Sequence, residues 1–406
     1  MIVSRTETQI IKKSHLMWKV IDENCFYAKN LYNYANYMIR QEFIENGKWL
    51  RYQDLQKSLK ISDPYKQLRS QPSQCVLQIL DRSWKSYFVA IKDWNKNKFK
   101  YLGMPKLPGY KKKDGRFVWI IKNNCCYVKD DGEIHFRVSR LKGFKWTTQA
   151  KGRLICVRFV PMGTNYKMEV VTEVEVPDEP TYDSERVCSI DLGINNFVTL
   201  TNNIGIQPII INGKGIKSYN QFYNKQRSKT ISNLRKRNSQ SWSKKLSEIT
   251  FKRHNVVKNF MHNSSRFVLD FCIENSIDTL VCGINKEWKQ KSNIGNINNQ
   301  KMLFIPYDMF IKQLEYKCQD VGIKFITTEE SYTSGTSFLD GETPCKENYD
   351  KTRRVKRGLF QSGEGLINAD VNASLQIMRK VFSNVIDYEI VGVLNPIVIN
   401  VVKFAT

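Results

Sequence analysis

The sequence lacks the cysteine and histidine spacings that hold a structural zinc ion. Its 406 residues include ten cysteines without a Cys-x-x-Cys pair, and none of its four histidines has a second ligand at zinc-binding spacing. The same pattern gives no disulfide framework, so the cysteines are expected to be small buried apolar side chains. We therefore expect no zinc cofactor in this protein.

Long apolar runs are absent as well. No run reaches the ~18 residues that a membrane-spanning helix needs, and Met1 to Glu7 lack the apolar core of a signal peptide. Hydrophobic residues still make up 41% of the chain, which is enough for buried cores in several domains. We expect a cytoplasmic prokaryotic protein with no membrane partner, associated with the nucleoid when it is bound to DNA.

Negative charge is scarce. The chain has 64 Lys and Arg against 39 Asp and Glu, a formal net charge of +25, and residues 225–258 contain the single acid Glu248. A basic run is ordinarily a solvated helix face. Because the charge here is so one-sided, contact with phosphates is favoured, and nucleic acid is the first partner to expect.

Helices precede short strands in the first half of the chain. A strand is predicted at residues 2–12, and apolar residues then recur at helical spacing from Ala28 to Ile39 and from Leu77 to Ile91. Two prolines and two glycines within residues 103–109 end this helical part. The runs that follow predict a small antiparallel barrel or sandwich. They are Phe117 to Ile121, Cys126 to Val128, Ile134 to Val138, Leu154 to Val160 and Met168 to Val176.

From Val187 onward, strands alternate with helices, which predicts a mixed α/β sheet. The predicted strands are Val187 to Asp191, Phe197 to Thr201, Pro208 to Ile211, Thr279 to Cys282 and Lys324 to Thr328. The predicted helices lie within residues 225–258, around Ser265 to Glu274, around Asp308 to Asp320 and from near Asp370. A loop-rich insert, Tyr332 to Leu366, precedes the last helix.

Two acids have sequence contexts that suit metal-dependent phosphate chemistry. Asp191 ends an apolar strand, and Asp370 begins a helix whose dipole favours a carboxylate. Hydrolysis by two divalent ions needs carboxylates that converge from different elements, with the metals about 3.5–4 Å apart. Hard oxygen ligands suit Mg²⁺ or Mn²⁺. Taken singly, Asp191 could be a turn-forming residue before Leu-Gly, and Asp370 could be an ordinary acidic residue at the start of a helix. Taken together in a basic chain, the two acids indicate a nuclease.

Four ordered motifs carry a resemblance over nearly all of the chain. They are Gly-x-Pro-x-Leu-Pro-x-Tyr-Lys at 103–111, Ile-Asp-Leu-Gly-Ile-Asn-Asn at 190–196, Tyr-Thr-Ser at 332–334 and Asn-Ala-Asp-Val-Asn-Ala-Ser at 368–374. The sequence resembles the TnpB family, transposon-encoded RNA-guided DNA nucleases with an RNase H-like (RuvC-type) domain, related to type V CRISPR effectors. The resemblance implies that Asp191 and Asp370 are the first and last catalytic acids.

The same resemblance implies a multidomain α+β organisation with a helical recognition lobe, a small β-barrel wedge domain and an RNase H-like mixed α/β domain. The expected parts are residues 1–13 (first wedge strand), 14–110 (recognition), 111–182 (wedge barrel), 183–330 (nuclease), 331–366 (target nucleic-acid-binding insert) and 367–406 (nuclease, C-terminal part). The wedge is expected to grip the guide RNA scaffold.

The chain departs from the family pattern at the middle catalytic acid. Gly283 stands where a glutamate is expected, and Glu287 falls beyond that strand. Some relatives take the acid from a neighbouring strand, which directs attention to Glu329 and Glu330. Because side chains alternate along a strand, only one of the two can face the metals, and Glu330 is favoured. The predicted metal ligands are Asp191, Glu330 and Asp370.

A second departure is the insert, where Cys345 alone remains of the family's usual zinc ribbon. Its Lys and Arg residues still predict contact with nucleic acid. The predicted nucleic-acid contacts over the whole chain are Lys85, Lys92, Lys111, Lys112, Lys113, Arg235, Lys236, Arg237, Lys244, Lys245, Lys252, Arg253, Lys289, Arg353 and Arg354.

The function expected from the resemblance is an RNA-guided DNA endonuclease with Mg²⁺, or Mn²⁺, as cofactor. Its partners would be a guide RNA, from a transposon end or a CRISPR array, and double-stranded DNA carrying a short flanking motif. Two alternatives stay open: a guided repressor whose nuclease is inactive, and a CRISPR-associated effector of the same chemistry. Monomer and dimer are both compatible with the sequence.

Overall fold

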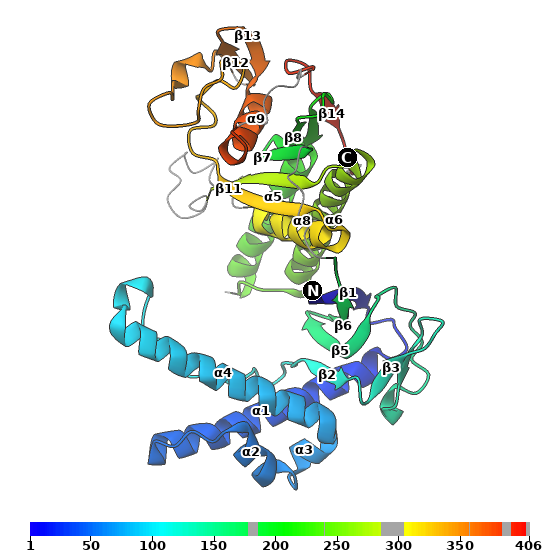
Figure 1. Ribbon diagram of the computed structural model, residues 1–406. Coiled ribbons are helices and arrows are strands. Elements are labelled where there is room, and N and C mark those ends of the chain that lie inside the picture. Colours follow the sequence, from blue (N-terminus) through cyan, green and yellow to red (C-terminus); the bar gives the residue numbers. More distant parts are fainter. Residues whose placement is uncertain (178–185, 239, 286–303, 357, 384–390, 403–406) are drawn as a thin grey trace. The chain divides into compact units, whose positions relative to one another are not determined.

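The computed structural model describes residues 1–177, 186–238, 240–285, 304–356, 358–383 and 391–402. The chain divides into two compact units, Met1–Glu175 and Val176–Thr406 (Figure 1). Among the described residues, no helix combines the length and the apolar composition that crossing a membrane requires.

Helices dominate the first part of the N-terminal unit. Its elements are β1 (Ile2–Ile11), α1 (Trp18–Asn46), α2 (Tyr52–Leu59), α3 (Asp63–Leu68) and α4 (Ser70–Lys96). The two predicted helices are therefore confirmed as α1 and α4. They are joined through the core by the buried Trp84, whose indole N–H donates to the side-chain oxygen of Asn36 at 2.9 Å.

The proline-rich segment that ends this helical part runs along α1. The side-chain amide of Asn36 donates to the carbonyl of Pro108 at 2.9 Å, and Asn33 donates to the carbonyl of Lys111 at 2.9 Å and accepts from its N–H at 2.8 Å. Lys29 donates to the carbonyl of Lys113 at 2.6 Å. One face of α1 therefore satisfies a backbone that has no secondary-structure partner of its own.

The strands of this unit form an antiparallel sheet in the order β1-β6-β5-β2 and a separate hairpin, β3-β4. They are β2 (Trp119–Lys122), β3 (Cys126–Val128), β4 (Ile134–Phe136), β5 (Arg153–Met162) and β6 (Asn165–Glu175). The predicted antiparallel strands are present. Within the described residues no pairing joins β1 to β2, so closure into a barrel is not confirmed.

The C-terminal unit contains a six-stranded mixed sheet in the order β11-β10-β7-β8-β9-β14. Its elements are β7 (Val187–Leu192), β8 (Asn196–Asn202), β9 (Ile209–Asn212), α5 (Lys214–Asn238), α6 (Lys244–Glu274), β10 (Thr279–Ile284), α8 (Tyr307–Val321), β11 (Lys324–Glu329), β12 (Leu359–Ser362), β13 (Gly365–Asn368), α9 (Ala369–Val381) and β14 (Ile397–Ile399). Strands β7, β8 and β9 are antiparallel, whereas β10 and β11 run parallel to β7. This strand pattern fits an RNase H-like core.

Three details differ from the sequence prediction. The helix expected around Ser265 to Glu274 is the end of the single long helix α6. The insert expected to be loop-rich ends in the β12-β13 hairpin. The edge strand β14, which pairs with β9, was not predicted, because its short apolar run gives no period that distinguishes strand from loop.

Opposite faces of the sheet pack against different helices. Cys188 and Ile190 of β7 lie in the core formed with α6 and α8, whereas Val187 packs with Ile377 and Met378 of α9. Because strand residues alternate between faces, Ser189 and Asp191 share the α9 face with Val187. The sheet therefore separates an α6-α8 layer from α9 (Figure 1).

Gly283 lets α9 approach the sheet closely. A Cβ atom at Gly283 would lie 2.4 Å from Cδ1 of Ile377. No real contact of that kind is so short, and Gly283 has an ordinary φ, so its glycine is explained by packing and not by backbone conformation. A glutamate at this position would force α9 away from β10.

Gly283→Ala is expected to lower the free energy of unfolding by about 1–3 kcal/mol, because an added methyl overpacks the contact with Ile377. Ile377→Val removes Cδ1 and should restore part of that loss in the double variant. Chemical denaturation of the four proteins measures the coupling. Gly103→Ala is the control, since a Cβ there meets no atom within 4 Å. Equal stabilities of Gly283→Ala and the unaltered protein would refute the packing argument.

Candidate functional site

Three carboxylates from three separate elements interact electrostatically on the α9 face of the sheet. Asp191 lies near the end of β7, Glu330 follows β11 directly, and Asp370 lies in the first turn of α9. The pKa of Asp191 is raised well above its ordinary value of 3.8, because burial removes the carboxylate from water and because Glu330 and Asp370 place negative charge beside it. This mutual repulsion is what a cation would relieve.

Strand alternation separates Glu330 from Glu329. Ile326 of β11 packs with the α9 layer, and Glu330 has the same parity, whereas Phe325 and Glu329 belong to the opposite face. The N–H of Glu330 donates to the carbonyl of Ile284 at 3.2 Å, which extends the β10-β11 pairing by one residue. Glu329 is exposed. Of the two glutamates, Glu330 is the one whose charge acts on Asp191.

The motif around Asp370 positions that residue through its polar neighbours. Asn368 caps α9 by accepting from the N–H of Asp370 at 3.0 Å. One turn later, the buried hydroxyl of Ser374 donates to the carbonyls of Ser189 and Thr199 at 3.0 and 3.1 Å. The helix start is therefore fixed against β7 and β8 by hydrogen bonds.

The buried Asn372 ties the same helix to the insert. Its side-chain amide donates to the carbonyl of Thr336 at 2.8 Å, and its oxygen accepts from the N–H of Phe338 at 2.9 Å. On the next turns, Arg379 donates to the carbonyl of Phe338 at 2.9 Å. These bonds explain why polar residues recur along a helix face that is otherwise core.

The turn after β7 fixes the backbone next to Asp191. A Cβ at Gly193 would lie 2.4 Å from the carbonyl oxygen of Asn196, so only glycine permits this tight approach. The hydroxyl of Tyr307 donates to the carbonyl of Gly193 at 2.9 Å. Burial and the charges of Asp191 and Glu330 raise the pKa of Tyr307, which keeps its hydroxyl protonated and able to donate.

Two side chains engage Asp370 directly. Asn196 donates to Oδ2 at 2.6 Å, and Arg354 lies 3.4 Å from Oδ1. Asn196 lies inside the motif at 190–196, but the motif did not predict a role for it, because the contact forms only when the start of α9 packs beside the start of β8. Arg354 was predicted to contact nucleic acid, and its pairing with Asp370 places it at the carboxylates.

The donor set fits a hard divalent cation, since it consists of carboxylate oxygens from Asp191, Glu330 and Asp370. Among the described residues, no three Asp, Glu, His or Cys side chains are grouped closely enough to hold a metal ion as they stand. Arg354 supplies the positive charge next to Asp370 instead. A cation bound to all three carboxylates would replace that charge.

The predicted nucleic-acid contacts fall into separate groups. Lys85 and Lys92 are exposed on α4, and Lys112 and Lys113 are exposed on the segment along α1, where Lys111 packs between the rings of Tyr32 and Phe117. Exposed side chains on α5 and α6 are those of Arg235, Lys236, Arg237, Lys244, Lys245 and Lys252. Lys289 and Glu287 lie outside the described residues.

Arg253 and Arg353 are among the predicted contacts that have partners within the protein. Arg253 donates to the side chain of Asn220 at 2.9 Å and to the carbonyl of Phe304 at 2.6 Å. Arg353 forms ion pairs with Asp340 and with Glu342, the latter at 2.7 Å. Both guanidinium groups hold the fold together, and their contact with phosphates stays a prediction. Contact of the other listed lysines and arginines with nucleic acid also stays a prediction.

Asp191→Asn is expected to raise the melting temperature in the presence of a chelator, because the substitution removes a buried charge that Glu330 and Asp370 repel. A raised folded-state pKa means that ionisation destabilises the fold as pH rises through that pKa. The gain should therefore be largest at alkaline pH and shrink as pH falls toward 3.8. Thermal melts across pH measure it. Glu329→Gln is the matched control, and an equal gain from both variants would contradict the proposed repulsion.

Two family profiles match the chain. Residues 169–289 match OrfB_IS605, described as a probable transposase, and residues 307–377 match the TNB domain of the Cas12f1-like type. The first segment contains Asp191, and the second contains Glu330 and Asp370. Among curated proteins, none matches the chain.

Solved structures with similar chains include a Cas12f1-sgRNA-target DNA complex (17% identity, 92% of this chain and 98% of that chain, TM-score 0.38). The mini-RNA-guided endonuclease CRISPR-Cas_phi3 is similar at 10% identity over 93% of this chain and 92% of that chain, with a TM-score of 0.46. CasPhi-2 (Cas12j) bound to crRNA is similar at 9% identity over 93% and 98%, with a TM-score of 0.44. The two profile matches agree with the resemblance of the four motifs to the TnpB family of transposon-encoded proteins related to type V CRISPR effectors.

Proposed function

We propose that this protein is an RNA-guided DNA endonuclease that hydrolyses phosphodiesters by a RuvC-type mechanism. The observation that carries the proposal is the convergence of Asp191, Glu330 and Asp370 from three elements on one face of an RNase H-like sheet. Carboxylates that repel one another lower the stability of a fold. Metal binding by these carboxylates would explain why a basic protein carries them together.

The three carboxylates would hold Mg²⁺, or Mn²⁺ in its place. When bound, the metal would activate water and stabilise the leaving oxygen of the phosphodiester. Asn196 orients Asp370 through its hydrogen bond, and the Ser374 hydroxyl holds the helix that carries Asp370. Arg354 lies beside Asp370, and in the proposed site its guanidinium group would help to neutralise a bound phosphate.

The profile matches and the resemblance to the TnpB family support guide RNA and double-stranded DNA as the partners. In this scheme base pairing reads the target, and the protein recognises backbone and a short flanking motif. We assign residues 14–110 to recognition, 1–13 and 111–182 to the wedge, 183–330 and 367–406 to the nuclease, and 331–366 to the target-binding insert. The net charge of +25 supplies the attraction for both nucleic acids.

A guided repressor with an inactive nuclease is the second candidate function. It gains support if no third acid reaches Asp191 and Asp370, since Gly283 cannot supply one. The charge of Glu330 on Asp191 favours the nuclease over this alternative. A CRISPR-associated effector would use the same chemistry with a different source of RNA.

Asp191→Ala, Asp370→Ala and Glu330→Gln are each expected to reduce DNA cleavage by roughly 100-fold or more, because each removes a metal ligand. RNA binding should not change, since none of the three is proposed to contact RNA. The assay is cleavage of a plasmid library with Mg²⁺ by protein co-purified with its RNA.

Glu329→Gln is the matched control for Glu330→Gln, because both remove one charge at neighbouring positions of the same strand end. Retained cleavage by Glu330→Gln together with loss by Glu329→Gln would overturn the assignment of the third ligand. RNA bound by the unaltered protein without any cleavage would establish the repressor instead.

A further inference from the structure

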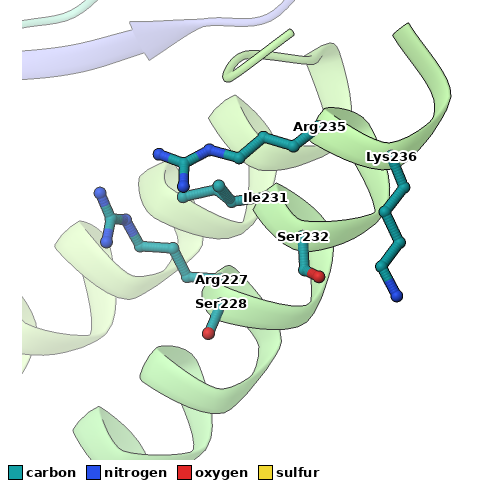
Figure 2. Close-up of a pocket in the computed structure, with 6 residues that line it drawn as sticks. All are labelled: Arg227, Ser228, Ile231, Ser232, Arg235 and Lys236. Carbon is teal, nitrogen blue, oxygen red and sulfur yellow. The ribbon is translucent and has the colours of Figure 1, made fainter. Parts of the chain in front are cut away.

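The last turns of α5 carry positive charge that the described part of the protein does not neutralise. Arg227, Ser228, Ile231, Ser232, Arg235 and Lys236 line a hollow of about 310 Å³, here called the α5 hollow. Figure 2 shows the guanidinium groups of Arg227 and Arg235 extending to the same side, with Ile231 between them. Among the described residues, none forms an ion pair or hydrogen bond with the side chains of Arg227, Arg235 or Lys236.

The α5 hollow lies near the closed end of an antiparallel helix pair. Arg253 of α6 donates to Asn220 of α5 at 2.9 Å, and the hydroxyls of Tyr223 and Thr250 lie 3.1 Å apart. Later residues of α5 therefore pair with earlier residues of α6. This register brings the last turns of α5 beside the first turns of α6 and beside residues 240–243 of the joining loop.

That loop presents an exposed indole. The side chain of Trp242 is 66% exposed, although tryptophan is ordinarily buried. The next residue, Ser243, caps α6 by accepting from the N–H of Leu246 at 3.1 Å, which fixes the backbone beside the indole. Lys244 and Lys245 follow and are exposed. An aromatic face held among cations is a feature of surfaces that bind unpaired nucleic acid.

We propose that the α5 hollow and Trp242 bind a single-stranded segment of RNA, an inference that rests on the proposed function. Arg227, Arg235 and Lys236 would hold successive phosphates, and Trp242 would stack on an unpaired base. The Ser228 and Ser232 hydroxyls can each donate and accept a hydrogen bond, which would match the ribose 2′-hydroxyl that DNA lacks. A duplex fits less well, because its bases are already stacked on one another.

The test measures binding of a short fluorescent unstructured RNA, the same sequence as DNA, and an RNA duplex to the full chain carrying Asp191→Ala. Arg227→Glu/Arg235→Glu is compared with Lys225→Glu/Lys229→Glu. The control pair changes the net charge equally, is exposed on the same helix, and does not line the α5 hollow. Trp242→Ala is compared with Phe222→Ala, which removes another exposed aromatic ring, 60% accessible, from α5.

Arg227→Glu/Arg235→Glu should weaken binding of single-stranded RNA far more than the control pair. It should also flatten the slope of log affinity against log salt by about 1.4, or about 0.7 for each lost phosphate contact. Trp242→Ala should weaken the same complex roughly 5- to 150-fold, the range expected for one stacked base. Trp242→Phe should recover part of that loss, and thermal melts verify that each variant folds.

Equal losses in the two charge variants would overturn the proposal, because net charge alone would then explain binding. Equal affinity for RNA and DNA would overturn the choice of RNA, and equal effects of Trp242→Ala and Phe222→Ala would remove the stacking role. All of these outcomes leave the nuclease proposal intact, since they are measured in a cleavage-deficient background. Absence of cleavage by the unaltered protein, with RNA binding present, would refute the nuclease alone.

Discussion

The candidate metal centre depends on the close packing of α9 against the sheet. Two features make that packing possible: the missing side chain at Gly283 and the buried hydroxyls of Ser189, Thr201 and Ser374, which lie 2.7–3.3 Å from one another. Each buried hydrogen bond contributes on the order of 1 kcal/mol, and an unsatisfied hydroxyl would cost more. Together they fix the register of α9, and with it the position of Asp370 relative to Asp191.

The same packing bears on where the third acid lies. A glutamate at position 283 would collide with Ile377, so in the proposed metal site the carboxylate on this side comes from the residue after the neighbouring strand. Glu330 meets this condition because β11 pairs in parallel with β10, and its N–H continues the ladder past Ile284. The close packing of α9 at Gly283 is therefore compatible with the proposed third metal ligand at Glu330.

The positively charged side chains of this protein differ in the partners that surround them. Arg253 and Arg353 are bound to carbonyls or carboxylates of the protein itself and hold helices and the insert in place. Arg354 compensates Asp370 within the candidate centre. The cations of the α5 hollow have no described partner, and this difference marks them as available for a ligand. A count of lysines and arginines along the chain cannot separate these groups.

The sequence by itself determined the local features. Periodicity predicted α1, α4, α8 and most strands, because apolar spacing reflects which face of an element is buried. The charge balance indicated a nucleic-acid partner. The motifs around Asp191 and Asp370 indicated the resemblance to a family, because their glycine, asparagine and serine residues form turns and helix caps at fixed distances from the acids in the sequence. These signals need only neighbouring residues.

Contacts between distant segments were decided by the tertiary structure alone. The pairing of β14 with β9 and the hydrogen bond from Asn196 to Asp370 each join residues far apart in the chain. The placement of Glu330 beside Asp191 follows from β11 lying next to β10 and from the parity of its side chains. Electrostatic repulsion acts through space, so the coupling of the three carboxylates exists only once the sheet and α9 have assembled.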